Sequence, residues 1–278
     1  MSPRSVVLAI LALAALPPSP VRAELPSDWP DAIEDNSFLI EEAYNQEPGV
    51  VQYIFNASYV RPEGFWAIAF TNEWPVPGQT HQLSYTVPLA LSTDAGSGVG
   101  DLFLNYRYQL TTQEDGFAAI APRVSAILPT GDWRRGLGQG AYGVQVNLPV
   151  SRRFSRSWAG HLNAGASWRH DAQTLLDDGS VARDDLTSYI AGASAIWLAS
   201  PTFNVMLELV AYRDEERVDE FRVGHTTQTV FSPGFRYAVN TKKGQLVLGA
   251  AVLLGLDADS PDPGPFLYLS WEAPHWKP

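Results

Sequence analysis

The sequence contains no cysteine, which excludes disulfides, thiolate catalysis and cysteine-ligated metal sites. Charged residues are also scarce, at 18% of 278 residues, and most of them are acidic, giving a formal net charge of -11. An acidic surface disfavours nucleic acid as a partner. After residue 23 the chain has no apolar run of about 18 residues, so no transmembrane helix is predicted there.

The first 23 residues have the three-part layout of a secretory signal. Arg4 precedes an apolar run over residues 6–16, and small residues and prolines then lead to Ala23. An N-terminal anchor helix is the alternative, but the apolar run is too short to span a bilayer and the prolines would interrupt a longer helix. We therefore predict a signal peptide over residues 1–23, cleaved after Ala23.

Alternating apolar and polar residues dominate the rest of the chain. In residues 51–59, for example, odd-numbered positions such as Val51 and Tyr53 are apolar or aromatic, whereas Gln52 and Asn56 at even-numbered positions are polar. This is the pattern of a strand with one apolar and one polar face. Twelve such segments can be placed, at residues 51–59, 64–73, 82–91, 101–110, 117–128, 142–151, 158–168, 186–199, 202–212, 231–239, 245–256 and 265–272.

The length of these segments distinguishes two all-β architectures. A soluble β-sandwich also has strands with one apolar face, but they cluster around about 5 or 6 residues. A strand needs about 9–11 tilted residues to cross a bilayer, and most of the segments reach that length. We therefore predict an all-β fold, a transmembrane antiparallel up-and-down β-barrel of about 12 strands over residues 48–278, located in a bacterial outer membrane.

Connection lengths support the barrel, because outer-membrane barrels alternate short periplasmic turns with longer external loops. In the second half of the chain, short and long links alternate, at residues 151–155, 169–185, 200–201, 213–225, 240–244 and 257–264. The alternation is weaker in the first half, where the link at residues 61–64 should be external but is short.

Residues 24–47 precede the first strand and form an acidic N-terminal segment. Asp35 and Ser37 are suitable N-cap residues, so we predict a short helix within this segment. Its position before the barrel leaves two interpretations, a periplasmic segment or a plug in the lumen.

Several motifs between residues 37 and 151 resemble one known family. They are residues 37–52 (SFLIEEAYNQEPGVVQ), 82–88 (QLSYTVP), 98–101 (GVGD), 105–108 (NYRY), 122–132 and 145–151. In these motifs the chain is similar to the transporter-like outer-membrane proteins named for the MetA pathway of phenol degradation. The resemblance implies an outer-membrane barrel that passes or binds small molecules, with aromatic or hydrophobic compounds indicated by the family name. It supplies no catalytic residues.

If the apolar residues of each alternating strand face lipid, the polar residues between them point into the barrel. This predicts a lumen of mixed charge, lined by Asp101, Arg107, Arg123, Gln145, Asn147, His161, Glu208 and Arg236. Paired charges of this kind either fill a closed barrel or line a narrow selective path. We predict an outer-membrane channel or transporter for small molecules. The alternatives are a closed structural or lipid-binding barrel and a barrel hydrolase.

Neither a catalytic site nor a metal site is predicted. His81 and Ser84 fall on opposite faces of a strand, whereas His161 and Asn163 share a face and are interpreted as lumen residues. A hydrolase would have to use His161. The acidic groups at residues 177–185 and 214–220 lack the spacing of a calcium loop. We therefore predict no enzyme, no cofactor and no bound metal.

The predicted partners are those of an outer-membrane barrel, namely outer-membrane lipids, a small-molecule solute and the outer-membrane assembly machinery. That machinery is expected to recognise a last strand that ends on an aromatic residue. Here residues 273–278 continue past the last predicted strand, so Trp271 or Trp276 is the candidate substitute.

Overall fold

The structure, a computed structural model, describes residues 32, 33, 35–92, 96–114, 116–176, 178–219 and 222–274. The signal peptide predicted over residues 1–23 lies outside the described residues, as does Trp276. Among the described residues, no helix is long and apolar enough to cross a membrane.

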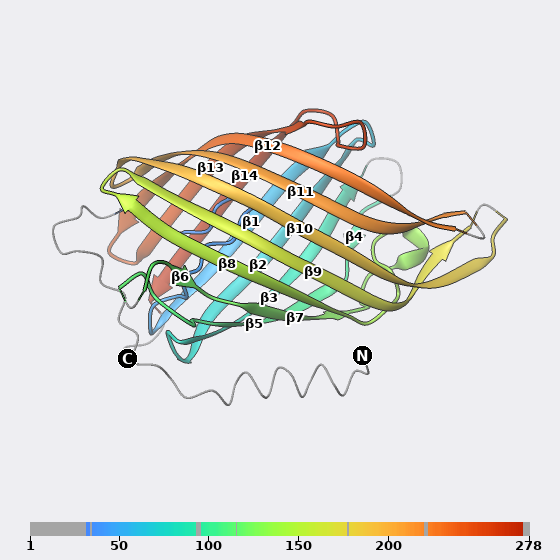
Figure 1. Cartoon of the computed structure of the whole chain (residues 1–278), viewed down its shortest axis with the longest axis horizontal. Coiled ribbons are helices and arrows are strands. Elements are labelled where there is room, and N and C mark those ends of the chain that lie inside the picture. Colours follow the sequence, from blue (N-terminus) through green and yellow to red (C-terminus); the bar gives the residue numbers. More distant parts are fainter. Residues whose placement is uncertain are drawn as a thin grey trace.

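Twelve antiparallel strands form a closed barrel (Figure 1), as the alternation predicted. β1 pairs with β14, from Val50 opposite Pro274 to Ser58 opposite Phe266, and this pairing closes the sheet. The barrel strands are β1 (Val50–Val60), β2 (Phe65–Gly78), β3 (His81–Ser92), β5 (Leu102–Tyr108), β7 (Arg123–Leu128), β8 (Gly143–Ser155), β9 (Trp158–Leu175), β10 (Val181–Ser200), β11 (Phe203–Asp219), β12 (Arg222–Thr241), β13 (Gly244–Gly255) and β14 (Gly264–Pro274). The short elements are β4 (Gly98–Val99), β6 (Ala119–Ile120) and the 3-10 helix η1 (Trp133–Arg135).

The outer surface of the barrel is apolar and its interior is mixed. On β11, Leu207 and Leu209 point outward and are 46% and 47% exposed, whereas Met206, Glu208 and Val210 point inward and are buried. Half-exposed leucines on one face of a strand are typical of a surface solvated by lipid tails. The neighbouring strand β12 shows the same pattern, because its Phe235 is exposed to about the same extent as these leucines.

The two ends of the barrel differ. At the end where β1 begins and β14 ends, called here the terminal end, the links at residues 79–80, 156–157, 201–202 and 242–243 are short turns. The link at residues 109–122 is the long one at that end, and it contains β6. At the opposite end, called here the hairpin end, β9 to β12 extend beyond the rest of the barrel (Figure 1).

Two links predicted as long loops are mostly strand. Residues 169–185 and 213–225 fall largely within the hairpins β9–β10 and β11–β12, which pair almost to their tips. Ion pairs hold these ribbons: Arg183 contacts Asp171 across β9–β10 at 3.0 Å, and Arg217 of β11 contacts Asp184 of β10. Charged and polar residues dominate these ribbons, and only a small apolar cluster, Ala172 and Leu186 with Val223 packed against them, is buried there, so the sequence loses the regular alternation that marks a half-buried strand.

The strand predicted over residues 117–128 is also shorter than expected. β7 begins at Arg123, directly after Pro122, which has no backbone N–H to donate to a neighbouring strand. Residues 119 and 120 form β6 instead and pair with Ser151 and Val150 of β8. The link at residues 109–122 therefore folds against the terminal end of the barrel.

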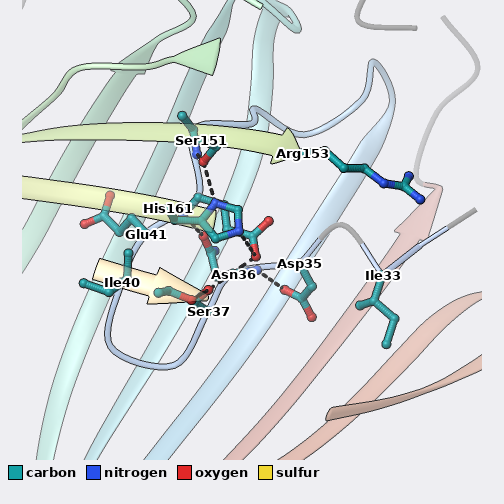
Figure 2. Close-up of polar contacts among 12 residues, drawn as sticks. Ile33, Asp35, Asn36, Ser37, Ile40, Glu41, Ser151, Arg153 and His161 are labelled. Carbon is teal, nitrogen blue, oxygen red and sulfur yellow. Dashed lines mark hydrogen bonds and ion pairs between the residues drawn. The ribbon is translucent and has the colours of Figure 1, made fainter. Parts of the chain in front are cut away.

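The N-terminal segment contains no helix in its described part, residues 32, 33 and 35–49, so the predicted helix was wrong. Residues 35–46, called here the lumenal segment, are irregular, and their polar groups bond to inward-facing side chains of the barrel (Figure 2). A helix would use its own backbone partners. Bonds to the barrel wall replace them here.

Candidate functional site

Arg236 of β12 anchors the start of the lumenal segment. Its guanidinium donates to the backbone carbonyls of Ile33 at 2.9 Å, Asn36 at 3.0 Å and Asp35, and it lies 3.3 Å from the Glu42 carboxylate. The planar guanidinium can serve several acceptors at once because it carries five N–H groups. One side chain thus ties two parts of the segment to the barrel wall.

Glu208 and Arg107 hold the middle and the end of the segment. On β11, one carboxylate oxygen of Glu208 accepts from the backbone N–H groups of Leu39 at 3.0 Å and Ile40 at 3.1 Å. On β5, Arg107 donates to the carbonyls of Glu42 at 3.1 Å and Tyr44 at 2.5 Å. Charged wall residues therefore satisfy both donors and acceptors of the extended backbone.

Side-chain pairs add a second set of contacts. Arg123 of β7 forms an ion pair with Glu41 at 2.5 Å and donates to Gln145 of β8 at 3.0 Å. Asn163 of β9 accepts from the backbone N–H of Glu41 at 2.9 Å and from the side-chain amide of Asn147 at 3.1 Å. Gln145 is thus linked to the segment through Arg123, and Asn147 through Asn163.

The carboxylate of Asp35 binds the part of the barrel wall formed by β1 and β14. It is 3% exposed and accepts hydrogen bonds from Gln52 of β1 at 2.5 Å and from the hydroxyls of Tyr268 and Ser270 on β14. Its oxygen also accepts from the backbone N–H of Asn36 at 2.8 Å. Several donors offset the cost of burying the charge. The segment is therefore fixed at the seam that closes the barrel.

Ser151, His161 and Glu42 form a chain of contacts (Figure 2). The Ser151 hydroxyl lies 2.7 Å from Nδ1 of His161, and Nε2 of His161 lies 3.6 Å from the Glu42 carboxylate. These residue types also build hydrolytic triads. Here, however, the Ser151 oxygen accepts from the backbone N–H of Ala43 at 2.7 Å, and Ser151 is fully buried. The arrangement holds the lumenal segment.

Asp101 stands apart from the other predicted lumen residues. It lies at the hairpin end, where its carboxylate accepts from the backbone N–H groups of Gly131 and Gln139, both at 3.1 Å, and pairs with Arg169 at 2.6 Å. A Cβ atom on Gly138 would collide with the same carboxylate. Asp101 thus fixes the loop between β7 and β8, and these partners lie outside the lumenal segment.

Cavities lie on both sides of the lumenal segment. One of about 300 Å³ is lined by Phe38 and Glu41 of the segment and by Asn56, Glu73 and Phe103 of the wall. A second, of about 310 Å³, shares a wall with it and reaches Arg169 and Asp214 toward the hairpin end. A third, much smaller at about 60 Å³, lies at the terminal end beside Glu42 and His161. The segment separates the first cavity from the third.

Sequence reasoning missed several residues that hold the segment. Gln52, Gln109, Ser151 and Ser194 are polar and lie on the inward parity of predicted strands, so their position was a usable signal. No such signal was available for Asp35, because its role depends on where the chain enters the barrel. Within the described ranges, no group of three or more histidine, aspartate or glutamate residues could hold a metal ion.

No protein-family model and no curated protein sequence matches the chain. The phenol-degradation resemblance therefore stays a prediction. Among solved structures, the fold is similar to that of the COG4313 outer membrane channel from Pseudomonas putida F1, with a TM-score of 0.58, 16% sequence identity, and coverage of 90% of this chain and 99% of that one. It is also similar to the NanC porin, with a TM-score of 0.52, 8% identity, and coverage of 80% of this chain and 98% of that one. At these identities the likeness concerns the fold, which is that of a closed outer-membrane-type β-barrel.

Proposed function

We propose that this chain is an outer-membrane channel for small solutes, closed at rest by its own lumenal segment. The apolar outer surface and the closed sheet support a position in a membrane. The two solved structures of similar fold are an outer membrane channel and a porin. The terminal end, with its short turns, then faces the periplasm, and the hairpin end faces outward.

The observation that carries the proposal is the position of the lumenal segment between cavities. Contacts from β1, β5, β7, β9, β11, β12 and β14 hold the segment from many sides of the barrel. A solute that enters from the hairpin end meets the segment before it can reach the terminal end. Passage therefore requires the segment to shift.

The large cavity supports a small amphipathic solute as the cargo. Phe38 of the segment and Phe103 of β5 give it apolar surface, while Asn56 and the Arg123–Glu41 pair supply hydrogen-bonding groups. A volume of about 300 Å³ is at the lower end of the range for small-molecule sites. An aromatic compound with a polar substituent, as the family resemblance implies, fits this combination.

Liposome swelling tests the proposal with two variants of the full chain. One lacks residues 35–46, and the other carries Arg236→Gln, which keeps the segment but removes its main anchor. Heat-modifiable migration on a gel shows that each barrel is folded. Both variants should admit small solutes faster than the wild type. Equal rates in all three proteins would contradict a plug, and no uptake by any of them would contradict a channel and favour the closed structural barrel.

A further inference from the structure

The outer surface of the barrel carries a cation among exposed aromatic rings at the terminal end. Arg152 lies near the end of β8, on the outward parity between the buried residues Ser151 and Arg153. Phe154 is 63% exposed on the same parity, and Phe117 of the link at residues 109–122 is 80% exposed. Rings so exposed to water are costly in a soluble protein, whereas a membrane interface accommodates them.

The contacts of Arg152 fix its guanidinium at this surface. Nη1 donates to the backbone carbonyl of Phe117 at 2.6 Å, and Cζ lies 3.8 Å from the centre of the Phe117 ring and 6.0 Å from that of Phe154. Gly160 of β9 leaves room for the second ring, because a Cβ atom there would come within 2.8 Å of Phe154. The guanidinium thus lies over the Phe117 ring, and the Phe154 ring is farther away.

The remaining donors of Arg152 have no carboxylate partner within the part of the chain that the structure describes. A guanidinium presents five N–H groups in a fork that matches the oxygens of a phosphate, and one of them is used by Phe117. The chain has a net charge of -11, and the described residues around Arg152 offer its guanidinium a backbone carbonyl and aromatic rings as partners. Among the described residues, an anionic group would therefore complement this guanidinium.

We propose that Arg152, Phe117 and Phe154 bind the phosphate headgroup of an anionic glycerophospholipid in the periplasmic leaflet. The guanidinium contacts the phosphate, and the two rings pack beside the glycerol and the first acyl carbons. Trp158, which is 49% exposed at the start of β9, pairs with Ser155 of β8, next to Phe154. The site rests on the outer-membrane location proposed above, but it does not depend on whether the lumen conducts.

Native mass spectrometry of the full chain in detergent tests this site. The probes are phosphatidylglycerol and diacylglycerol, which has the same acyl chains and no phosphate. The wild type should retain phosphatidylglycerol in preference to diacylglycerol, and Arg152→Gln should lower that retention several-fold. Arg152→Lys should lower it less, because lysine keeps the charge and loses the fork.

Arg183→Gln is the matched control, since Arg183 is an exposed arginine on the β9–β10 hairpin. It should retain phosphatidylglycerol as the wild type does, and heat-modifiable migration should show every variant folded. Equal retention by Arg152→Gln and the wild type would overturn the site. So would equal retention of diacylglycerol and phosphatidylglycerol by the wild type. Neither result bears on solute uptake, so failure here is distinguishable from failure of the channel.

Discussion

Arg236 of β12 and Glu42 of the lumenal segment form an ion pair across the interior of the barrel, with 3.3 Å between nitrogen and oxygen. Both side chains are almost fully buried, at 1% and 5% exposed. Removing one partner of such a pair is costly, because the other charge stays buried without compensation. The pair is therefore the contact whose loss should most loosen the segment.

Arg236→Gln should destabilise the docked segment by about 3–5 kcal/mol, the usual cost of breaking a buried ion pair. The barrel itself should stay folded, since its strand pairing does not involve this side chain. Hydrogen exchange of residues 35–46 should become faster, while exchange within β12 should not change. Unchanged exchange in the segment would show that the pair does not hold it. Arg183→Gln, which breaks an exposed ion pair with Asp171, is the control.

Asp101→Asn should release the loop between β7 and β8. The change removes the charge that pairs with Arg169 and weakens the bonds to the N–H groups of Gly131 and Gln139. Charge-assisted bonds of this type contribute about 1.5–3 kcal/mol each. Exchange of these two amides should accelerate, with no change in the lumenal segment. Asp262→Asn, at an exposed position in the β13–β14 link, should leave them as in the wild type.

The apolar outer surface gives a direct test of membrane location. Leu209→Arg places a charge on the outward face of β11, and if that face contacts lipid, an arginine at the bilayer midplane costs about 2–4 kcal/mol. Unfolding by urea in lipid vesicles should shift to lower denaturant by a corresponding amount. Glu216→Arg, at an exposed position near the tip of the β11–β12 hairpin, should change the urea midpoint little. Equal effects at the two positions would argue against a lipid-facing surface.

The twelve strands could be predicted because membrane-crossing segments alternate strictly between lipid and lumen. That signal ends at the hairpin end, where β9 to β12 extend beyond the rest of the barrel. Residues 213–217 are charged without exception, so nothing in them distinguishes a loop from the strand that they form in β11. Likewise, Pro122 interrupts a run of residues with strand character, and the prediction carried the strand through it.

The alternation along each strand predicted that the candidate residues point inward, but it could not predict which residues they contact. Arg236 and Glu42 are 194 residues apart, and only the closed barrel brings them together. The helix predicted near Asp35 was wrong for a related reason. Local capping signals favoured a helix, but wall side chains such as Glu208 satisfy the backbone of an extended chain instead.

The claim that the lumenal segment must move for a solute to pass can be tested by locking it. Ser37 of the segment and Ser194 of β10 have their hydroxyl oxygens 3.2 Å apart, and the chain has no cysteine of its own. A Ser37→Cys, Ser194→Cys double variant should therefore form one disulfide on oxidation. Solute uptake into liposomes should fall to background in the oxidised protein and return to the wild-type rate on reduction, with no such change in the Ser37→Cys single variant. Equal uptake by the oxidised and reduced double variant would contradict the account.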